Sequence, residues 1–190
     1  MVMKNTGYTE TLSFLFIAIC VLCYSVGRLY DVGSLLGCAV HRPAYTLLSY
    51  SFFHVSFIHL FLNMLVFGSI YPALAYREGK WKTLATGICL SALAGWITAG
   101  TKPVLGASGL NYVFLGWIFA IQLKEQGRGI TLKYGALLLV SLVAGLLHPA
   151  IQGSLHVAAC MGGFIFYYMN VLFSGTERVR LRMKNRNDHN

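Results

Sequence analysis

Charged side chains are scarce in this sequence. They make up 11% of its 190 residues, against about 25% in an average soluble domain. Only six residues are acidic, which is too few to solubilise a surface of this size. Hydrophobic residues make up 56% of the chain, and the mean hydropathy is +0.62. The composition therefore excludes an ordinary soluble protein, and the length predicts a single membrane domain over residues 1–190.

The net charge of +9 does not indicate a nucleic-acid partner. Five of the fifteen basic residues lie in the last thirteen positions, and most of the others fall in short breaks between apolar runs. That distribution is typical of membrane topology. The five cysteines follow no zinc-ligand spacing, and the C-x-x-C of Cys20 and Cys23 lies inside an apolar run, where we interpret it as two small packing residues.

Six apolar runs are long enough to cross a bilayer or nearly so. They predict an all-α, polytopic bundle of six transmembrane helices with its core at 11–173. A basic polar tail follows over 174–190, and we expect it to be mobile and to lie on anionic headgroups. The first run resembles a secretory signal, but no small-residue cleavage site follows it, so we expect it to be retained. The predicted helices are 11–27, 55–75, 83–99, 108–123, 131–147 and 154–173.

The orientation follows from the positive charges. Six spans leave both termini on one side, and that side carries twelve Lys and Arg residues against three on the other. The positive-inside rule therefore predicts cytoplasmic termini. The expected location is a bacterial inner or plasma membrane. The longest connecting segment, 28–54, is rich in apolar residues and tyrosine, so we expect it at the membrane interface.

Few polar side chains lie inside the predicted helices, and such residues are costly there and usually functional. His59 and Asn63 are four residues apart and share one helical face. Ser108 opens the fourth helix and His156 lies near the start of the sixth, so alternating helix directions bring all four residues to a similar depth. A histidine base can activate a serine nucleophile, and donors can stabilise the oxyanion that forms. No Asp or Glu lies within the predicted spans, which leaves a dyad as the serine–histidine option.

Each of these residues also has a purely structural interpretation. Ser108 could cap its helix, His156 could bond a backbone carbonyl, and His59 with Asn63 could form an interhelical pair. A metal site on His54, His59 and His156 is disfavoured, because no carboxylate or cysteine joins them at ligand spacing. Asn111 is expected on another helical face, bonded to a neighbouring helix. Tight packing of the fourth and sixth helices is predicted by small residues at Gly106, Gly109, Gly116, Ala158, Ala159, Gly162 and Gly163.

Three motifs together resemble the rhomboid intramembrane serine proteases over about residues 43–173. The first is H-x4-H-x3-N in the second helix, the second is G-x-S-G at the start of the fourth helix, and the third is a histidine that opens the last helix. The residues that carry the resemblance are His54, His59 and Asn63, then Gly106, Ser108, Gly109 and Tyr112, and finally His156.

This resemblance implies a role for each matching residue. Ser108 would be the nucleophile and His156 the general base. The side chains of His59 and Asn63 and the Ser108 amide would form the oxyanion hole. Tyr112 would stack on the His156 ring, and His54, Gly106 and Gly109 would support the site. Ala159 departs from the family pattern, which usually has glycine three residues after the last histidine.

The family fold is a six-helix bundle around a water-filled cavity, with a first loop that dips into the membrane and a fifth helix that gates substrate entry. The partners implied are the lipid bilayer and single-span membrane proteins as substrates, with no cofactor and no metal. Two alternatives stay open from the sequence. One is an inactive relative that binds membrane clients, and the other is a processor of C-terminal sorting tails. A transporter is disfavoured because no inverted repeat is evident.

Overall fold

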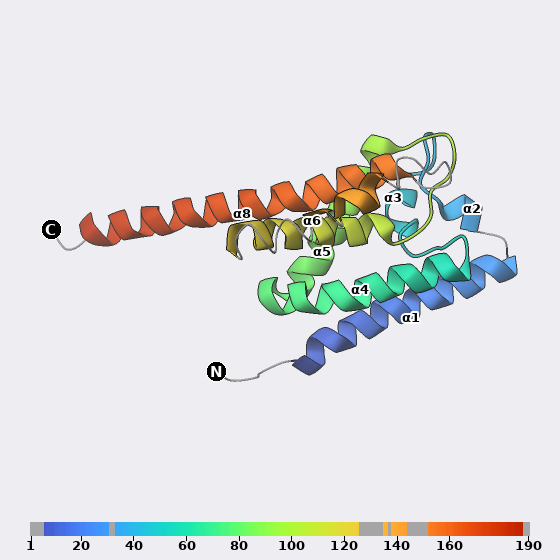
Figure 1. Ribbon diagram of the computed structural model, residues 1–190, viewed down its shortest axis with the longest axis horizontal. Helices are drawn as coiled ribbons and strands as arrows, with labels where there is room; N and C mark the ends of the chain where they lie inside the picture. Colours follow the sequence, from blue (N-terminus) through green and yellow to red (C-terminus); the bar gives the residue numbers. More distant parts are fainter. Residues whose placement is uncertain (1–5, 31–32, 126–134, 137, 144–151, 188–190) are drawn as a thin grey trace.

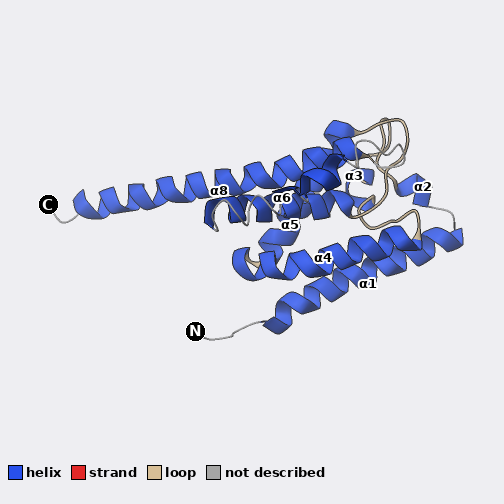
Figure 2. Cartoon of the chain, viewed as in Figure 1, coloured by secondary structure: helices blue, strands red, loops and turns tan. Residues whose placement is uncertain are grey.

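The computed structural model describes residues 6–30, 33–125, 135–136, 138–143 and 152–187. Throughout these ranges the chain is helical, with loops and a single isolated β-bridge between them, so the predicted all-α class is confirmed (Figures 1 and 2). The elements are α1 (Thr6–Tyr30), α2 (Gly33–Leu36), α3 (Thr46–Ser49), α4 (Phe57–Glu78), α5 (Lys80–Thr98), α6 (Ser108–Glu125) and α8 (Gly153–Asn187).

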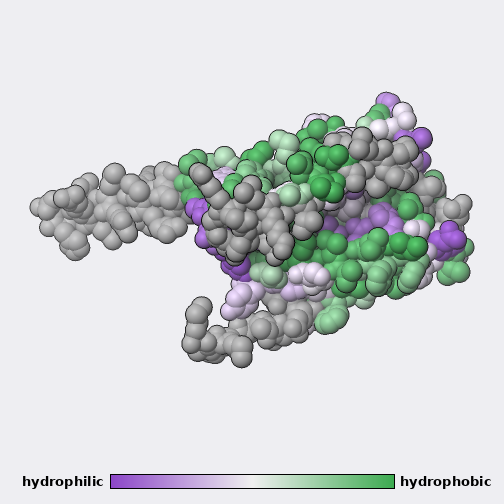
Figure 3. All heavy atoms as spheres, viewed as in Figure 1, coloured by the Kyte–Doolittle hydropathy of each residue, from purple (hydrophilic) through white to green (hydrophobic). Residues whose placement is uncertain are grey.

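Three of the described helical stretches are long and apolar enough to cross a membrane, namely Thr11–Tyr30, Phe57–Glu78 and Gly153–Phe173. Large apolar side chains on them face outward, including Phe14, Phe61 and Ile165, each more than half exposed. Hydrophobic atoms accordingly cover much of the visible bundle (Figure 3). An apolar surface of this extent marks contact with other apolar material, and in a chain of this composition that material is lipid.

About half of the fifth predicted helix, 131–147, lies outside the described residues. Within it, residues 135–136 and 138–143 are helical. The sixth predicted helix matches the start of α8, but α8 does not end near 173. It continues to Asn187 and projects from the bundle (Figure 1).

The segment that we expected as a polar tail after residue 173 is thus helical as far as residue 187. Residues 176–187 contain no glycine or proline, and most are arginine, leucine, methionine, lysine or glutamate, which favour helix. Once the apolar part of α8 has formed, each added residue needs no new nucleus, so the helix propagates into the basic segment.

Helices α6 and α8 cross with their backbones in contact. A Cβ atom on Gly116 would lie 1.9 Å from the Cys160 carbonyl oxygen, and one on Gly163 would lie 1.9 Å from the Val113 carbonyl oxygen. Glycine is thus required at both positions. This agrees with the close packing predicted for the fourth and sixth helices, except that Gly162 faces α5 and has room for a Cβ atom.

The segment between α1 and α4 folds back onto the bundle instead of only lining its surface. Cys38 and Val104 exchange two backbone hydrogen bonds of 3.0 and 2.9 Å, which join this segment to the loop before α6. Tyr50 is fully buried, and its hydroxyl lies 2.6 Å from the Ser91 hydroxyl of α5. The loop is therefore a packed part of the core that holds the approach to α6.

The described ion pairs lie at the opposite end of the bundle. Gly79 joins α4 to α5 with φ of 95°, a conformation that glycine adopts without strain. Arg77 of α4 donates two hydrogen bonds to Glu125 at the end of α6, at 2.7 and 2.5 Å. Lys82 bonds Glu78 at 3.2 Å. These ion pairs join α4, α5 and α6 at the helix ends.

Candidate active site

Ser108 and His156 meet where α6 and α8 begin. Ser108 is the first residue of α6, and His156 lies in the first turn of α8, which begins at Gly153. Ser108 Oγ lies 2.9 Å from His156 Nε2, within hydrogen-bond distance. His156 is buried, and within the described residues its Nδ1 has no hydrogen-bond partner. The pair is thus a serine and a histidine without a carboxylate behind the imidazole.

Tyr112 holds one face of the His156 ring. It follows Ser108 by one helical turn, and its ring stacks on the imidazole with centroids 4.3 Å apart and planes 19° apart. The Tyr112 hydroxyl forms a hydrogen bond with Ser141 Oγ in the helical segment 138–143. The stacked pair therefore also touches the part of the chain where the fifth helix was predicted.

Two backbone hydrogen bonds fix the residues that precede Ser108. The Gly106 amide donates to the Tyr50 carbonyl at 2.8 Å, and the Ala107 amide donates to His54 Nε2 at 3.3 Å. Gly106 has φ of 128°, and a Cβ atom there would lie 2.5 Å from His59 Cε1. Only glycine satisfies both the backbone conformation and the close approach of the His59 ring.

His54 is a neutral hydrogen-bond acceptor in this arrangement. Burial, and after it the neighbouring His59 ring, lower the pKa of His54 to about 4. Because its Nε2 accepts from the Ala107 amide, the proton of the neutral ring resides on Nδ1. The two rings meet edge to face, with centroids 5.3 Å apart. His54 thus contacts the backbone before Ser108 and packs beside His59.

The start of α4 places His59 and Asn63. Ser56 caps the helix by accepting from the His59 amide at 3.2 Å, which puts His59 in the first turn and Asn63 one turn later on the same face. The Asn63 side chain is buried, and its Nδ2 donates to the His59 carbonyl at 2.8 Å. The structure therefore brings the His59 ring against Gly106 and Asn63 against α6.

Asn111 was expected to bond a neighbouring helix, but the sequence did not indicate which residue is its partner. Its Nδ2 lies 3.0 Å from the Asn63 carbonyl oxygen and 3.1 Å from Asn63 Oδ1. One sequence signal was available, because residues three apart on a helix are neighbours and Asn111 follows Ser108 by three. No spacing in the sequence predicts that its partner is Asn63 on α4, 48 positions earlier.

The arrangement can support attack by a hydroxyl on a carbonyl. A neutral imidazole at hydrogen-bond distance can take the Ser108 proton. The first four amides of a helix have no intrahelical acceptor, so the amide at Ser108 is available to an oxyanion. In the part of the chain that the structure describes, no three histidine, cysteine, aspartate or glutamate residues group as a metal site.

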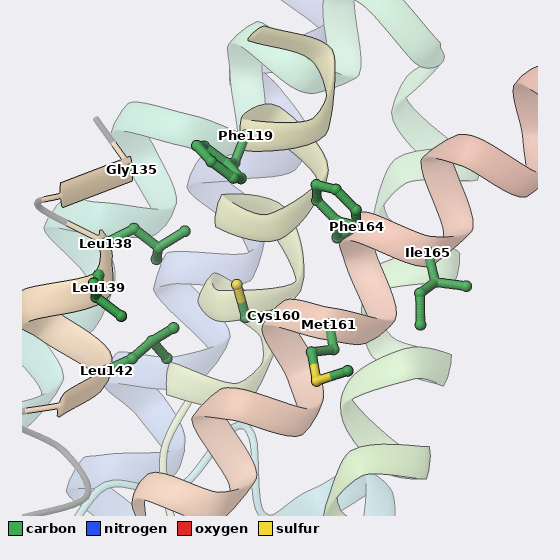
Figure 4. A pocket seen from close by; sticks show the side chains of 9 residues that line it. All are labelled: Phe119, Gly135, Leu138, Leu139, Leu142, Cys160, Met161, Phe164 and Ile165. Carbon is green, nitrogen blue, oxygen red and sulfur yellow. The ribbon is translucent and has the colours of Figure 1, made fainter. Parts of the chain in front are cut away.

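Two cavities lie deeper along α6. One, of about 270 Å³, lies between α6, α8 and the segment 135–143, and Figure 4 shows the apolar side chains around it, among them Phe119, Leu138 and Met161. Its described lining is apolar apart from the thiol of Cys160. The other, of about 370 Å³, lies between α4, α6 and the same segment, and Ser141 lines it.

Comparison with known proteins gives one consistent result. A family model described as the Rhomboid domain matches residues 41–173. A protein named Rhomboid protease GlpG from Klebsiella pneumoniae is 27% identical over 136 residues, which cover 68% of this chain and 49% of that protein. The protein of the same name from Yersinia enterocolitica is 27% identical over 127 residues, covering 63% of this chain and 46% of its own length. The chain therefore spans about half the length of the curated relatives it matches.

Proposed function

The chain belongs to the rhomboid family, and on that premise we propose that it is a serine-type endopeptidase that cleaves other membrane proteins within or beside the bilayer. Its family and its long apolar helices make it an integral membrane protein. The observation that carries the proposal is the 2.9 Å contact between Ser108 Oγ and His156 Nε2. Nucleophile and base at hydrogen-bond distance are the minimum that this chemistry requires.

In the proposed reaction, Ser108 Oγ attacks the scissile carbonyl while His156 Nε2 takes its proton. The tetrahedral intermediate collapses to an acyl-enzyme, and the imidazolium returns the proton to the leaving amine. A water molecule then attacks the acyl carbon and gives a proton to His156. The imidazolium returns this proton to Ser108 Oγ as the second product leaves, which regenerates the free enzyme. Stacking on Tyr112 keeps the imidazole plane in one orientation through both halves of the reaction.

The oxyanion of each tetrahedral intermediate would be stabilised by the Ser108 amide and by the side chains of His59 and Asn63. Two observations support this role. His59 packs against Gly106 next to the nucleophile, and Asn63 lies one turn further along the same face. Fixed donors of this kind contribute more to rate than mobile ones, because they need no reorganisation when charge develops.

The proposed setting is a single domain of six membrane spans in a bacterial inner or plasma membrane, with both termini in the cytoplasm. The start of α1 and the end of α8 lie toward the same end of the molecule, which fits an even number of spans (Figure 1). A substrate segment would approach through the cavity between α4, α6 and the segment 138–143. Ser141 lines this cavity and bonds Tyr112, and Tyr112 stacks on His156, so the cavity lies next to the reaction site.

The test is cleavage of a single-span reporter by the purified protein in lipid vesicles. The reporter should carry small and helix-destabilising residues near the outer end of its span. We expect cleavage by the wild type and none by Ser108→Ala. Capture of the reporter without cleavage by either protein would contradict the protease assignment and indicate a client-binding relative. A second reporter with a C-terminal sorting tail separates a general protease from a sorting-tail processor by the ratio of the two rates.

A further inference from the structure

We propose that Asn111 is a positioning residue that fixes the side-chain amide of Asn63 with its nitrogen, not its oxygen, toward the reaction site. The inference rests on the proposed function, because it assigns a purpose to Asn63 as an oxyanion donor. It goes beyond that function because Asn111 is outside the three motifs that identified the site. The evidence is a pair of hydrogen bonds between α6 and α4 which, together with the bond from Asn63 Nδ2 to the His59 carbonyl, leave each amide one orientation.

The orientation of Asn111 is set by the backbone of α4. The Asn63 main-chain carbonyl lies 3.0 Å from one terminal atom of the Asn111 side chain. A carbonyl oxygen can only accept, so that terminal atom must be the Nδ2 donor. Turning the Asn111 amide over would place its Oδ1 against the Asn63 carbonyl oxygen inside the bundle, where Asn111 is only 4% exposed.

The orientation of Asn63 follows from that of Asn111. The same Nδ2 lies 3.1 Å from a terminal atom of the Asn63 side chain, which must then be the acceptor Oδ1. The Asn63 Nδ2 consequently lies on the other side, where it donates to the His59 carbonyl at 2.8 Å. His59 is one turn nearer the start of α4, and Ser108 is one turn nearer the start of α6, so this is the side of the reaction site.

An amide nitrogen carries two hydrogens, and the His59 carbonyl accepts only one of them. The second is available to an oxyanion above Ser108. If Asn63 were turned over, its oxygen would face both the His59 carbonyl and the developing negative charge, and a donor would become a source of repulsion. Asn111 and the His59 carbonyl therefore together hold Asn63 in the orientation that assists the transition state, and Asn111 does so without touching the substrate itself.

A merely structural role for Asn111 predicts a different outcome. An interhelical hydrogen bond that only stabilises the bundle would, when removed, lower the melting temperature and leave the rate per folded molecule unchanged. A positioning role predicts a lower rate per folded molecule that depends on Asn63. The two roles are separated by measuring melting temperature and saturating rate on the same samples.

The experiment uses the full chain in detergent and a fluorophosphonate probe that labels the nucleophilic serine. The variants are Asn111→Leu and Asn111→Ser, Asn63→Ala, and the double variant Asn63→Ala/Asn111→Leu. Asn111→Ser serves if the leucine variant does not fold. The matched control is Tyr71→Phe in the half of α4 away from the site. It removes the part-buried hydrogen bond from the hydroxyl of the buried Tyr71 side chain to the Lys80 carbonyl, at 3.0 Å.

We expect Asn63→Ala to lower the saturating labelling rate by about 100-fold, as loss of an oxyanion donor does. Asn111→Leu should lower it by about tenfold with little change in probe affinity, because it misplaces a donor without removing it. The double variant should label no more slowly than Asn63→Ala, since Asn111 acts only through Asn63. Tyr71→Phe should melt earlier and label at the wild-type rate.

A wild-type rate in Asn111→Leu beside a slow Asn63→Ala would overturn the positioning role and leave the proposed function intact. So would a double variant whose loss is the product of the two single losses. Absence of labelling in the folded wild type would instead remove the proposed function, and the role of Asn111 with it.

Discussion

The two ends of the helical bundle hold polar groups in opposite ways. Around Ser108, where α4, α6 and α8 begin, the polar side chains of the site are uncharged and mostly buried, and His54 and Asn63 are 6% and 7% exposed. At the end where α4 and α6 finish, Arg77 and Glu125 carry full charges and are 40% and 42% exposed. The first set makes hydrogen bonds inside the bundle, such as those between Asn111 and Asn63, and the second makes exposed ion pairs that water can replace.

This difference indicates where the chain can support chemistry. A buried neutral group that loses its partner bears the full cost of desolvation, so its neighbours must stay in place. An exposed ion pair contributes little, because its charges are almost as well solvated apart. We therefore expect changes at the first end to alter activity strongly, and changes at the second to alter stability slightly.

The largest effect is expected from the pair at the centre of the buried end. Ser108→Ala and His156→Ala should each lower cleavage of a single-span reporter by about 10⁴-fold or more, and the double variant should be no worse than either, because the two residues act as one unit. Cleavage rates in lipid vesicles measure this. Losses that multiply in the double variant would show that the two residues act independently.

The next effect concerns the crossing of α6 and α8, which connects the two ends. Gly163→Ala should destabilise the fold by about 3 kcal/mol or more, because its Cβ atom would lie 1.9 Å from a carbonyl oxygen of α6. Gly162→Ala is the matched control, since its Cβ atom would have no neighbour nearer than 3.9 Å. Thermal unfolding in detergent compares the two. Equal melting temperatures would contradict the crossing described for these helices.

A smaller effect is expected on folding stability at acidic pH, through protonation of His54. Its pKa is lowered from the ordinary 6.5 to about 4, so between these values the unfolded chain binds a proton that the folded chain excludes. Stability should therefore be complete above pH 6.5 and fall as the pH drops toward 4. His54→Gln keeps an acceptor for the Ala107 amide and should show a shallower decline. Melting temperatures from pH 7.5 to 4.5 test this, and parallel curves for the two proteins would exclude His54 as a source of the dependence.

The smallest effect is expected at the charged end. Glu125→Gln breaks the exposed pair with Arg77 and should cost less than about 1 kcal/mol, with the difference shrinking further in salt. Reporter cleavage should stay at the wild-type rate. A large loss of activity in this variant would mean that the exposed ion pair affects the reaction site. That result would contradict the expectation that the two ends of the bundle act separately.

The sequence predicted the residues of the site better than the contacts between them. Ser108, His156, His59 and Asn63 were found because each lies in a local spacing or opens a helix. The contact of Asn111 with Asn63 depends on how α6 and α4 pack, and no spacing along the chain encodes that distance. Their catalytic roles stay predictions until the variants are measured.

The fold shows the same division. Composition and apolar runs predicted an all-helical membrane protein, and small residues predicted the close approach of α6 and α8. From hydropathy, the end of the last helix was predicted near residue 173. Hydropathy indicates where a helix leaves the lipid, but not where its backbone hydrogen bonding ends. The burial of Tyr50 was not predicted either. A tyrosine in a long loop is typical of the membrane interface, and the sequence does not show that its hydroxyl contacts Ser91 on another helix.

The most direct test of the account is the site of fluorophosphonate attachment. The purified wild type should be labelled, and peptide mapping should place the adduct on Ser108, with labelling lost in Ser108→Ala and in His156→Ala. An adduct on another residue, or labelling that survives Ser108→Ala, would contradict the claim that Ser108 and His156 form a working nucleophile and base.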